Sequence, residues 1–396
     1  MAEVTNYIDR LVAELCPDGV EYRPLSDVVE KNYGGGTPSK AKEEYWGGDI
    51  PWASVGDLSN DLMEIFDTRS KITPAGVSGS STNVVPAGAV IVAIKIAPGK
   101  MKIAGVDLAI NQDIRGLVLN DLMNARFLTY YFRTLRFAGH GTIVKSITNK
   151  RLMDTEVPVP PLEIQEAIVE ILDKFTNLEA ELEAELEART LQYEYYRDSL
   201  FEALDCPRVP LGSLGVRNKG IAITASKMRT LEPGNKDVRI FAAGSTFVDT
   251  DSSFIPAKGI LEGPAIIVKS RGHIGFEYYE GKFTHKNELW SYSLTSDLVE
   301  QKFIYYYLLT QAYHLHELAR GKSVKLPQLA VKDTDELLVP LPSLEEQQRI
   351  VDILDRFDAL TSSLSEGLPA ELAARRSQYE YYRDQLLSFP RKGENQ

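Results

Sequence analysis

The sequence V-P-V-P-P-L-E-I-Q-E-A-I-V-E-I-L-D-K-F, residues 157–175, recurs in related form as V-P-L-P-S-L-E-E-Q-Q-R-I-V-D-I-L-D-R-F, residues 339–357. The copies are 182 residues apart and share a P-x-P-x-L-E-x-Q entry and an I-L-D triplet. Further along, Q-Y-E-Y-Y-R-D is unbroken at residues 192–198 and 378–384, now 186 residues apart. Seven identical consecutive residues beside a matched entry do not arise by chance, so the chain contains an internal repeat.

Each repeated block has the pattern of a long helix. Apolar residues in the first block recur every 3.56 residues on average, between the 3.5 of a coiled coil and the 3.6 of a straight helix. Residues 162–201 contain neither Pro nor Gly, which predicts one helix of roughly 60 Å. Within it, residues 178–189 repeat a four-residue L-E-A-E unit, either as helix-forming filler or as a spacer of defined length. One apolar stripe needs a partner, and the second block is the similar element.

The second block holds four extra residues between Phe357 and its Q-Y-E-Y-Y-R-D phrase. Four residues turn a helix by about 400°, so the apolar stripe is displaced by only ~40°. Gly367 and Pro369 lie close to this insertion. We therefore predict a break or kink there, with Pro369 in the first turn of a new helical segment.

The regions that surround the two blocks differ in most residues but share landmarks in the same order. The paired landmarks are a P-L entry at Pro24 and Pro210, strand-like runs at residues 89–93 and 265–268, helical patterns at residues 125–137 and 301–316, and G-x-x-x-K at residues 141–145 and 321–325. We interpret the two regions as domains of one fold whose surfaces have diverged.

These patterns predict an α+β fold with a pseudo-two-fold internal repeat. Two mixed α/β domains are separated by two long helices, which pair as an antiparallel coiled coil. The predicted segments are 1–156 for the first domain, 157–205 for the first helical spacer, 206–338 for the second domain and 339–396 for the second helical spacer.

The net charge of −12 is concentrated on the repeated blocks. Residues 157–201 carry 11 acidic and 3 basic residues, and residues 340–389 carry 9 and 5. Because the remainder is balanced, the acidic total does not exclude a nucleic-acid partner. The most apolar run, residues 87–97, is too short to span a bilayer, and no secretory signal is visible. With two cysteines as well, we expect a cytoplasmic protein that does not use a membrane.

The sequence lacks the common catalytic motifs. There is no G-x-x-x-x-G-K-[ST] loop, no H-E-x-x-H, no G-x-S-x-G and no C-x-x-C pair. His314 and His316 are two residues apart, which points them to different faces of a helix. We therefore predict neither catalytic residues nor metal ligands.

The chain resembles the specificity subunit of Type I restriction–modification systems over nearly its whole length. The two repeated blocks carry this resemblance, together with G-G-T-P-S at residues 35–39 and Y-W-G-G-D-I-P-W at residues 45–52. Gly99-Lys100 and A-I-N-Q at residues 109–112 are similar to later landmarks of the family. The second domain departs from the pattern, because residues 237–241 (D-V-R-I-F) stand where D-I-P-W is expected.

The resemblance implies a non-catalytic subunit with two target recognition domains. Each domain would read one half of a bipartite, asymmetric site on double-stranded DNA, and the two conserved helices would hold the domains apart. Two modification (methyltransferase) subunits would dock on those helices, and restriction (motor–nuclease) subunits would join them. S-adenosylmethionine, ATP and Mg²⁺ would belong to these partners, which carry the DNA adenine methyltransferase and ATP-dependent endonuclease activities, and no cofactor to this chain.

Base and phosphate contacts need basic or amide side chains that loops present. The DNA-contact candidates are Lys40, Lys95, Lys100, Lys102, Gln112, Lys145, Lys227, Arg229, Lys269, Arg271, His273, Lys286, Lys322 and Lys325. A wider set adds Lys42, Arg115, Lys150, Arg217, Lys219 and His285. The partner-contact candidates on the repeated blocks are Gln165, Ile168, Tyr193, Tyr196, Arg197, Gln347, Ile350, Tyr379, Tyr382 and Arg383.

Two other functions compete with DNA recognition. The chain could be a coiled-coil scaffold whose two α/β domains bind protein or carbohydrate, in which case binding would be insensitive to salt. It could also be an enzyme with an unrecognised site, which activity of the purified chain alone would establish.

Overall fold

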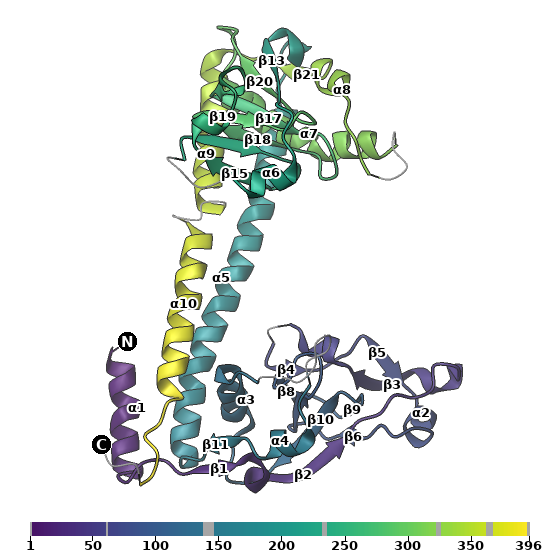
Figure 1. The fold of residues 1–396 in the computed structure, drawn as a ribbon, viewed down its shortest axis with the longest axis vertical. Helices are drawn as coiled ribbons and strands as arrows, with labels where there is room; N and C mark the ends of the chain where they lie inside the picture. The colour runs from purple at the N-terminus through teal and green to yellow at the C-terminus, as the bar shows by residue number, and fades with distance from the viewer. Residues whose placement is uncertain are drawn as a thin grey trace. The chain divides into compact units, whose positions relative to one another are not determined.

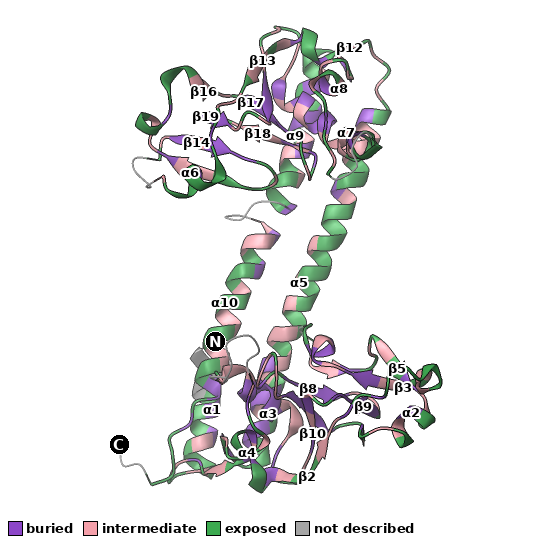
Figure 2. Ribbon diagram, turned by 45° about the vertical axis from the view of Figure 1, so that its right-hand side comes forward, coloured by how far each residue is buried: buried purple, intermediate pink, exposed green. Residues whose placement is uncertain are grey.

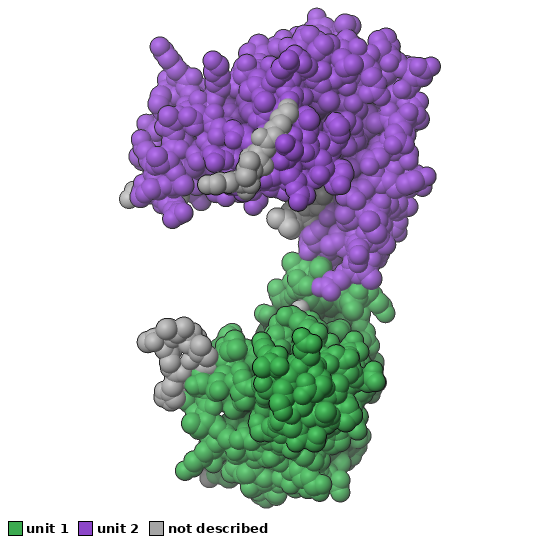
Figure 3. Space-filling view, turned by 90° about the vertical axis from the view of Figure 1, so that its right-hand side faces the viewer, with its two compact units in different colours: residues 1–182, 372–396 green, residues 183–371 purple. Residues whose placement is uncertain are grey.

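The structure is a computed structural model that describes residues 2–60, 62–137, 146–231, 236–321, 326–361 and 367–393. The chain forms two compact units (Figure 3). Unit 1 comprises residues 1–182 and 372–396, and unit 2 comprises residues 183–371. The long helix α5 (Leu162–Glu202) begins in unit 1 and ends in unit 2, as its lack of Pro and Gly predicts.

Unit 1 contains short helices, many short strands and parts of two long helices (Figure 1). Its helices are α1 (Ala2–Leu15), α2 (Pro74–Ser78), α3 (Ala125–Thr134) and α4 (Asn149–Met153), with the first half of α5 and most of α10 (Leu368–Leu386). Its strands are β1 (Tyr22–Pro24), β2 (Val29–Gly34), β3 (Trp46–Ala53), β4 (Glu64–Ile65), β5 (Ser70–Ile72), β6 (Val84–Val85), β7 (Val90–Ala93), β8 (Met101–Ala104), β9 (Leu108–Ile110), β10 (Ile114–Leu119) and β11 (Glu156–Pro158).

Unit 2 is built from the corresponding elements. Its helices are α6 (Ala225–Arg229), α7 (Gln301–Gly321), α8 (Val331–Asp335) and α9 (Leu344–Thr361), with the second half of α5. Its strands are β12 (Arg208–Pro210), β13 (Gly215–Lys219), β14 (Val238–Phe241), β15 (Phe247–Thr250), β16 (Leu261–Glu262), β17 (Ala265–Lys269), β18 (Gly275–Tyr279), β19 (Lys282–His285), β20 (Trp290–Leu294) and β21 (Leu338–Pro340).

The sheets of the two units have the same topology. Order β2-β10-β7-β8 in unit 1, extended by β4, matches order β13-β20-β17-β18 in unit 2. Order β5-β3-β9-β6 matches order β15-β14-β19-β16, and β3–β9 and β14–β19 are the parallel pairs of both. The two-stranded sheets β1-β11 and β12-β21 also correspond. The internal repeat is therefore structural, and β14 stands in the place of the strand that contains D-I-P-W, as predicted.

The largest buried cluster of each unit lies between its first sheet and its helices, and a further cluster lies between its two larger sheets. Figure 2 shows the buried residues on these strands and helices. In unit 1, Phe127 and Tyr130 of α3 pack in one cluster with Ile168 and Leu172 of α5. In unit 2, residues of α7 cluster in the same way with Ile350 and neighbouring residues of α9. The first sheet of each unit is thus attached through one helix to the repeated block. This shared packing explains why the start of that block is so similar in the two copies.

The repeated blocks pair in antiparallel order within each unit. In unit 1, Phe175 of α5 stacks on Tyr382 of α10, with ring centroids 5.8 Å apart. Glu179 of α5 also forms a 2.6 Å ion pair with Arg376 of α10. In unit 2, Phe357 of α9 stacks on Tyr196 of α5, also at 5.8 Å. The same Phe–Tyr contact therefore forms in both units despite the four-residue insertion, as the ~40° displacement of the stripe predicts.

The second block comprises two helices in the described residues. Helix α9 ends at Thr361, α10 begins at Leu368, and residues 362–366 lie outside the described ranges. Pro369 occupies the first turn of α10, as predicted, where a missing backbone N–H breaks no helical bond. Of the helices that can be described, none is long and apolar enough to cross a membrane.

Candidate nucleic-acid interface

Of the predicted DNA-contact residues of unit 1 that the structure describes, all but one lie on loops. Lys40 is exposed on the loop before β3. Lys95 forms a 2.8 Å ion pair with Asp113, and Lys100 donates to the carbonyl of Ser59 at 3.1 Å. Lys40 thus lies in the connection between β2 and β3, and Lys95 and Lys100 lie in the connection between β7 and β8. Such loops offer side chains to a partner.

Gln112 follows β9 and is exposed. Its Oε1 accepts a hydrogen bond from the Thr37 hydroxyl, and its Nε2 donates to Asp113 at 3.3 Å. The amide is thereby held in one orientation between two loops. A fixed amide on a loop end is suited to reading one base edge.

Two predicted lysines lie inside the protein instead. Lys102 is 1% exposed, and its ammonium donates to the side chain of Asn60. Lys269 is 5% exposed, pairs with Glu277 at 3.0 Å and stands 5.0 Å from the centre of the Phe241 ring. Buried cations need such partners. Both lysines occupy short strands in which every residue is buried. The burial of these strands depends on packing against other elements, so the sequence alone could not distinguish the two lysines from surface lysines.

In unit 2 the exposed basic candidates that the structure describes occupy two places. Lys227 and Arg229 are exposed on the short helix α6, and Arg271 and His273 are exposed on the loop between β17 and β18. Lys286 is half-buried and pairs with Glu288 at 2.5 Å. Lys145, Lys322 and Lys325 lie outside the described residues, so their prediction stays untested.

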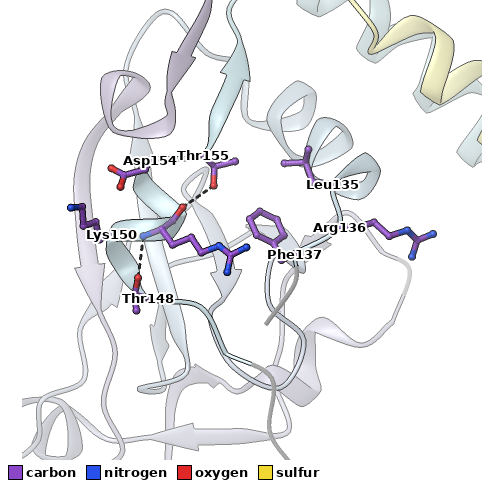
Figure 4. Close-up of a pocket in the computed structure, with 8 residues that line it drawn as sticks. Leu135, Arg136, Phe137, Thr148, Lys150, Asp154 and Thr155 are labelled. Carbon is purple, nitrogen blue, oxygen red and sulfur yellow. Dashed lines mark hydrogen bonds between the residues drawn. The ribbon is translucent and has the colours of Figure 1, made fainter. Parts of the chain in front are cut away.

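A pocket of about 480 Å³ in unit 1 brings together cations that the sequence did not group (Figure 4). It is lined by Leu135, Arg136, Phe137, Thr148, Lys150, Arg151, Asp154 and Thr155. The Thr148 hydroxyl caps α4 by accepting from the Arg151 backbone N–H at 3.1 Å. In Figure 4, Arg136 and Lys150 lie on opposite sides of Phe137. Three exposed cations against one carboxylate make this a positive region of the surface.

The predicted partner-contact residues Gln165 and Gln347 are fully buried and have the same structural role in both units. The Gln165 amide donates to the carbonyls of Leu122 and Pro160 at 2.8 Å and accepts from the Asn124 N–H at 2.8 Å. Gln347 makes the equivalent three bonds in unit 2. These amides satisfy the backbone at the helix entry, and Ile168 and Ile350, also 0% exposed, complete the same packing.

The aspartate of each I-L-D triplet fastens the domain helix to the repeated block. Asp173 accepts from the Tyr130 hydroxyl at 2.6 Å and from Arg126 at 2.9 Å. In unit 2, Asp355 accepts from the Tyr306 hydroxyl at 2.5 Å and from Lys302 at 2.7 Å. Burial, reinforced by the bond to the carboxylate, raises the pKa of both tyrosines well above the ordinary value. Both phenols therefore remain protonated donors.

The Q-Y-E-Y-Y-R-D phrases divide into an inner and an outer set. Tyr193 is 8% exposed, burial raises its pKa to about 12, and Arg197 stands 5.6 Å from its ring. Tyr379 and Arg383 form the equivalent pair at 5.7 Å. Tyr196 and Tyr382 stack on the facing phenylalanine of their unit.

Two tyrosines of these phrases, which the sequence reasoning passed over, face solvent. Tyr195 is 70% exposed and Tyr381 is 61% exposed. They occupy the same position of the phrase, and each makes an edge contact with the tyrosine that follows it. An aromatic residue that recurs at the same exposed position of both copies is the signal that could have found them.

No group of three or more His, Cys, Asp or Glu side chains able to hold a metal ion occurs among the residues that can be described.

Comparison with known proteins identifies one family over both units. The profile described as the Type I restriction modification DNA specificity domain matches residues 17–188 and 216–374. The chain is 32% identical over 292 residues to the specificity subunit of a type I restriction enzyme of Escherichia coli, with 67% of this chain and 71% of that protein covered. It is 26% identical over 401 aligned positions to a putative type I restriction enzyme specificity subunit of Haemophilus influenzae, with 93% and 96% covered.

Solved structures share the fold. The crystal structure of the S subunit of a Type-I restriction-modification system from M. genitalium aligns with a TM-score of 0.53 at 18% identity, covering 93% of this chain and 96% of that one. A chain from a structural study of complex assembly and conformational transition of the type I R-M system aligns with a TM-score of 0.63 at 17% identity, covering 93% and 97%.

Proposed function

This chain belongs to the specificity-subunit family of Type I restriction–modification systems, and from that premise we propose that it selects the DNA sequence on which such a complex acts. Unit 1 reads one half of a bipartite site on double-stranded DNA, and unit 2 reads the other. The site is asymmetric, because the two units present different side chains from the same loops. The chain itself is not catalytic.

The observation that carries this proposal is one topology used twice with different loop chemistry. The loop after β7 carries Lys95 and Lys100, whereas the equivalent loop after β17 carries Arg271 and His273. Arg and Lys pair with guanine and amide side chains with adenine. Gln112 follows β9 in unit 1, whereas Lys286 follows the equivalent strand β19 in unit 2, so unlike loops on like sheets select unlike base sequences. The shared sheets present those loops in the same way.

We further propose that the repeated blocks bind two copies of one modification subunit. The exposed tyrosines at position 195 and position 381 support two equivalent docking points, because a partner that recognises one recognises the other. Large exposed aromatic side chains are common centres of protein interfaces. Restriction subunits then join this core, and S-adenosylmethionine, ATP and Mg²⁺ are bound by the partners. The complex acts in the cytoplasm, where the DNA lies.

The test is selection from a random duplex library by the chain assembled with its modification subunits. We expect one motif with two specified parts, separated by unspecified base pairs, and unlike one another. Binding should weaken steeply between 50 and 200 mM salt, as phosphate contacts require. Enrichment of no motif, combined with salt-insensitive binding of a protein or a carbohydrate, would instead identify a coiled-coil scaffold.

A control separates recognition from general attraction to DNA. Lys227 and Arg229 are exposed on α6, which belongs to unit 2. Replacing both by Ala should weaken or relax the half-site that unit 2 reads and leave the other half-site unchanged. Equal loss in both halves would contradict the assignment of one half-site to each unit.

A further inference from the structure

Ile96, on the loop between β7 and β8, combines an unusual backbone with an unusual surface position. Its φ is +66°, in the left-handed region that β-branched residues rarely adopt. Its side chain is 61% exposed, so packing against the described residues covers less than half of it and offsets little of the strain. A single exposed apolar residue needs no explanation by itself. A strained one does, because strained residues persist where function requires them.

The equivalent position of unit 2 shows what the backbone at this point needs. Ile147 donates its N–H to the Ile94 carbonyl at 2.8 Å in unit 1, and Leu329 donates to the Ser270 carbonyl at 2.9 Å in unit 2. One residue further, Lys95 and Arg271 each form an isolated antiparallel bridge to the same returning segment of their unit. This register places Gly272 opposite Ile96.

Gly272 has φ +77°, close to the value at Ile96. A Cβ added to Gly272 would meet nothing within 4 Å, so this glycine is needed for its backbone and not for space. Glycine adopts that backbone without strain. Unit 1 therefore uses isoleucine at a position where its own counterpart uses the residue best suited to the conformation.

The loop that carries Ile96 is closed by its own hydrogen bonds, such as that from the Gly99 N–H to the Ala93 carbonyl at 2.9 Å, and lies beside the positive region described above. At its far end, a Cβ on Gly99 would come within 2.1 Å of the Phe137 ring, so the two segments are in close contact. Phe137 also lines the pocket that contains Arg136, Lys150 and Arg151. Ile96 is thus an exposed apolar residue on a loop whose far end contacts a pocket lined by exposed cations.

From these observations we infer that Ile96 is a specificity-determining residue of unit 1, which makes an apolar contact with the C5-methyl group of a thymine in the half-site. The inference rests on the proposed DNA-recognition function. The thymine methyl is the apolar group that the major groove presents, and apolar side chains distinguish it from the other bases. The neighbouring cations contact the phosphates and position the loop.

The experiment compares the motifs selected from random duplex by assembled complexes of the wild-type chain, Ile96→Gly and Ile96→Val. We expect Ile96→Gly to lose a preference for an A·T pair at one position of a single half-site, with the second half-site unchanged. Ile96→Val, which keeps a branched apolar side chain, should retain that preference. Replacing this thymine by uracil should weaken wild-type binding about fourfold, the value of one lost methyl contact, and leave Ile96→Gly unaffected.

Several outcomes would overturn the inference. They are an unchanged motif for Ile96→Gly, equal loss in both half-sites, and relaxation at a position where the wild-type chain prefers G·C. The fold is checked separately, because Ile96→Gly relieves strain and should keep or raise the thermal midpoint of unfolding. A wild-type complex that selects no motif at all would refute the proposed function itself, an outcome distinct from a motif that ignores Ile96.

Discussion

The contact between each domain helix and its repeated block makes a prediction that differs between the two units. Asp355 accepts hydrogen bonds from both the Tyr306 hydroxyl and the Lys302 ammonium. In unit 1 the Tyr130 hydroxyl also lies 3.1 Å from the Thr176 hydroxyl. Asp173→Ala therefore leaves Tyr130 with a second partner, whereas Asp355→Ala leaves the Tyr306 hydroxyl without a hydrogen-bond partner among the described residues.

The magnitudes follow from the hydrogen bonds. A bond to a charged group contributes about 1.5–3 kcal/mol, and an orphaned buried hydroxyl adds about 1 kcal/mol or more. We expect Asp355→Ala to destabilise α7 by about 3 kcal/mol and Asp173→Ala to destabilise α3 by about 1.5 kcal/mol. Glu170→Ala, which removes an exposed ion pair with Lys174, is the matched control and should cost less than about 0.5 kcal/mol.

The assay is amide hydrogen exchange followed by mass spectrometry. Peptides from α7 and from α3 report the opening of each unit separately, which a single unfolding curve of a chain with two units does not. A double-mutant cycle of Tyr306→Phe with Asp355→Ala should give a coupling of about 2 kcal/mol. A coupling below about 0.5 kcal/mol, or a larger effect in unit 1 than in unit 2, would refute this reasoning.

Three further perturbations test other parts of the account. Deleting one L-E-A-E unit, residues 182–185, shortens α5 by about 6 Å. The selected motif should then lose one or two unread base pairs between its halves, while both halves stay the same. An unchanged number of unread base pairs would contradict a spacer role. Replacing Tyr195 and Tyr381 by Ala should weaken binding of the modification subunit by about tenfold or more in calorimetry, whereas Tyr7→Ala, also exposed, should not. Burial lowers the pKa of His285, so the unfolded chain binds more protons than the folded chain. The free energy of unfolding of unit 2 should therefore be highest above pH ~6.5 and fall below it. In urea denaturation, His285→Asn should reduce the slope of this free energy against pH by up to about 1.4 kcal/mol per pH unit.

The sequence predicted the features that repeat or that follow a helical period. The length of α5, the two copies of one domain and the interruption before α10 could all be inferred, because each depends on local spacing or on comparing the chain with itself. The equivalence of β14 with the strand at residues 46–53 could also be inferred, although their residues differ, because their order along the chain is the same.

The site was harder to predict, because the exposure of a side chain depends on tertiary packing. Lys102 and Lys269 look like surface cations in the sequence, yet both lie inside, paired with Asn60 and Glu277. Tyr193 and Tyr195 differ by two positions in one phrase and face opposite ways. The strain at Ile96 could not be inferred, because isoleucine normally occupies strands and its presence does not indicate a left-handed backbone.

The central claim is that two domains of the same fold recognise different DNA sequences. One chimera tests it directly. Residues 25–157 replace residues 211–339, because both segments begin at the P-L entry and end in the matched strands β11 and β21. The chain then carries unit 1 chemistry twice on antiparallel repeated blocks. The measurement is the motif that the assembled chimera selects from random duplex. The account predicts a symmetric site, with the half-site of unit 1 present as an inverted repeat. Retention of the original asymmetric motif by a folded chimera would contradict it.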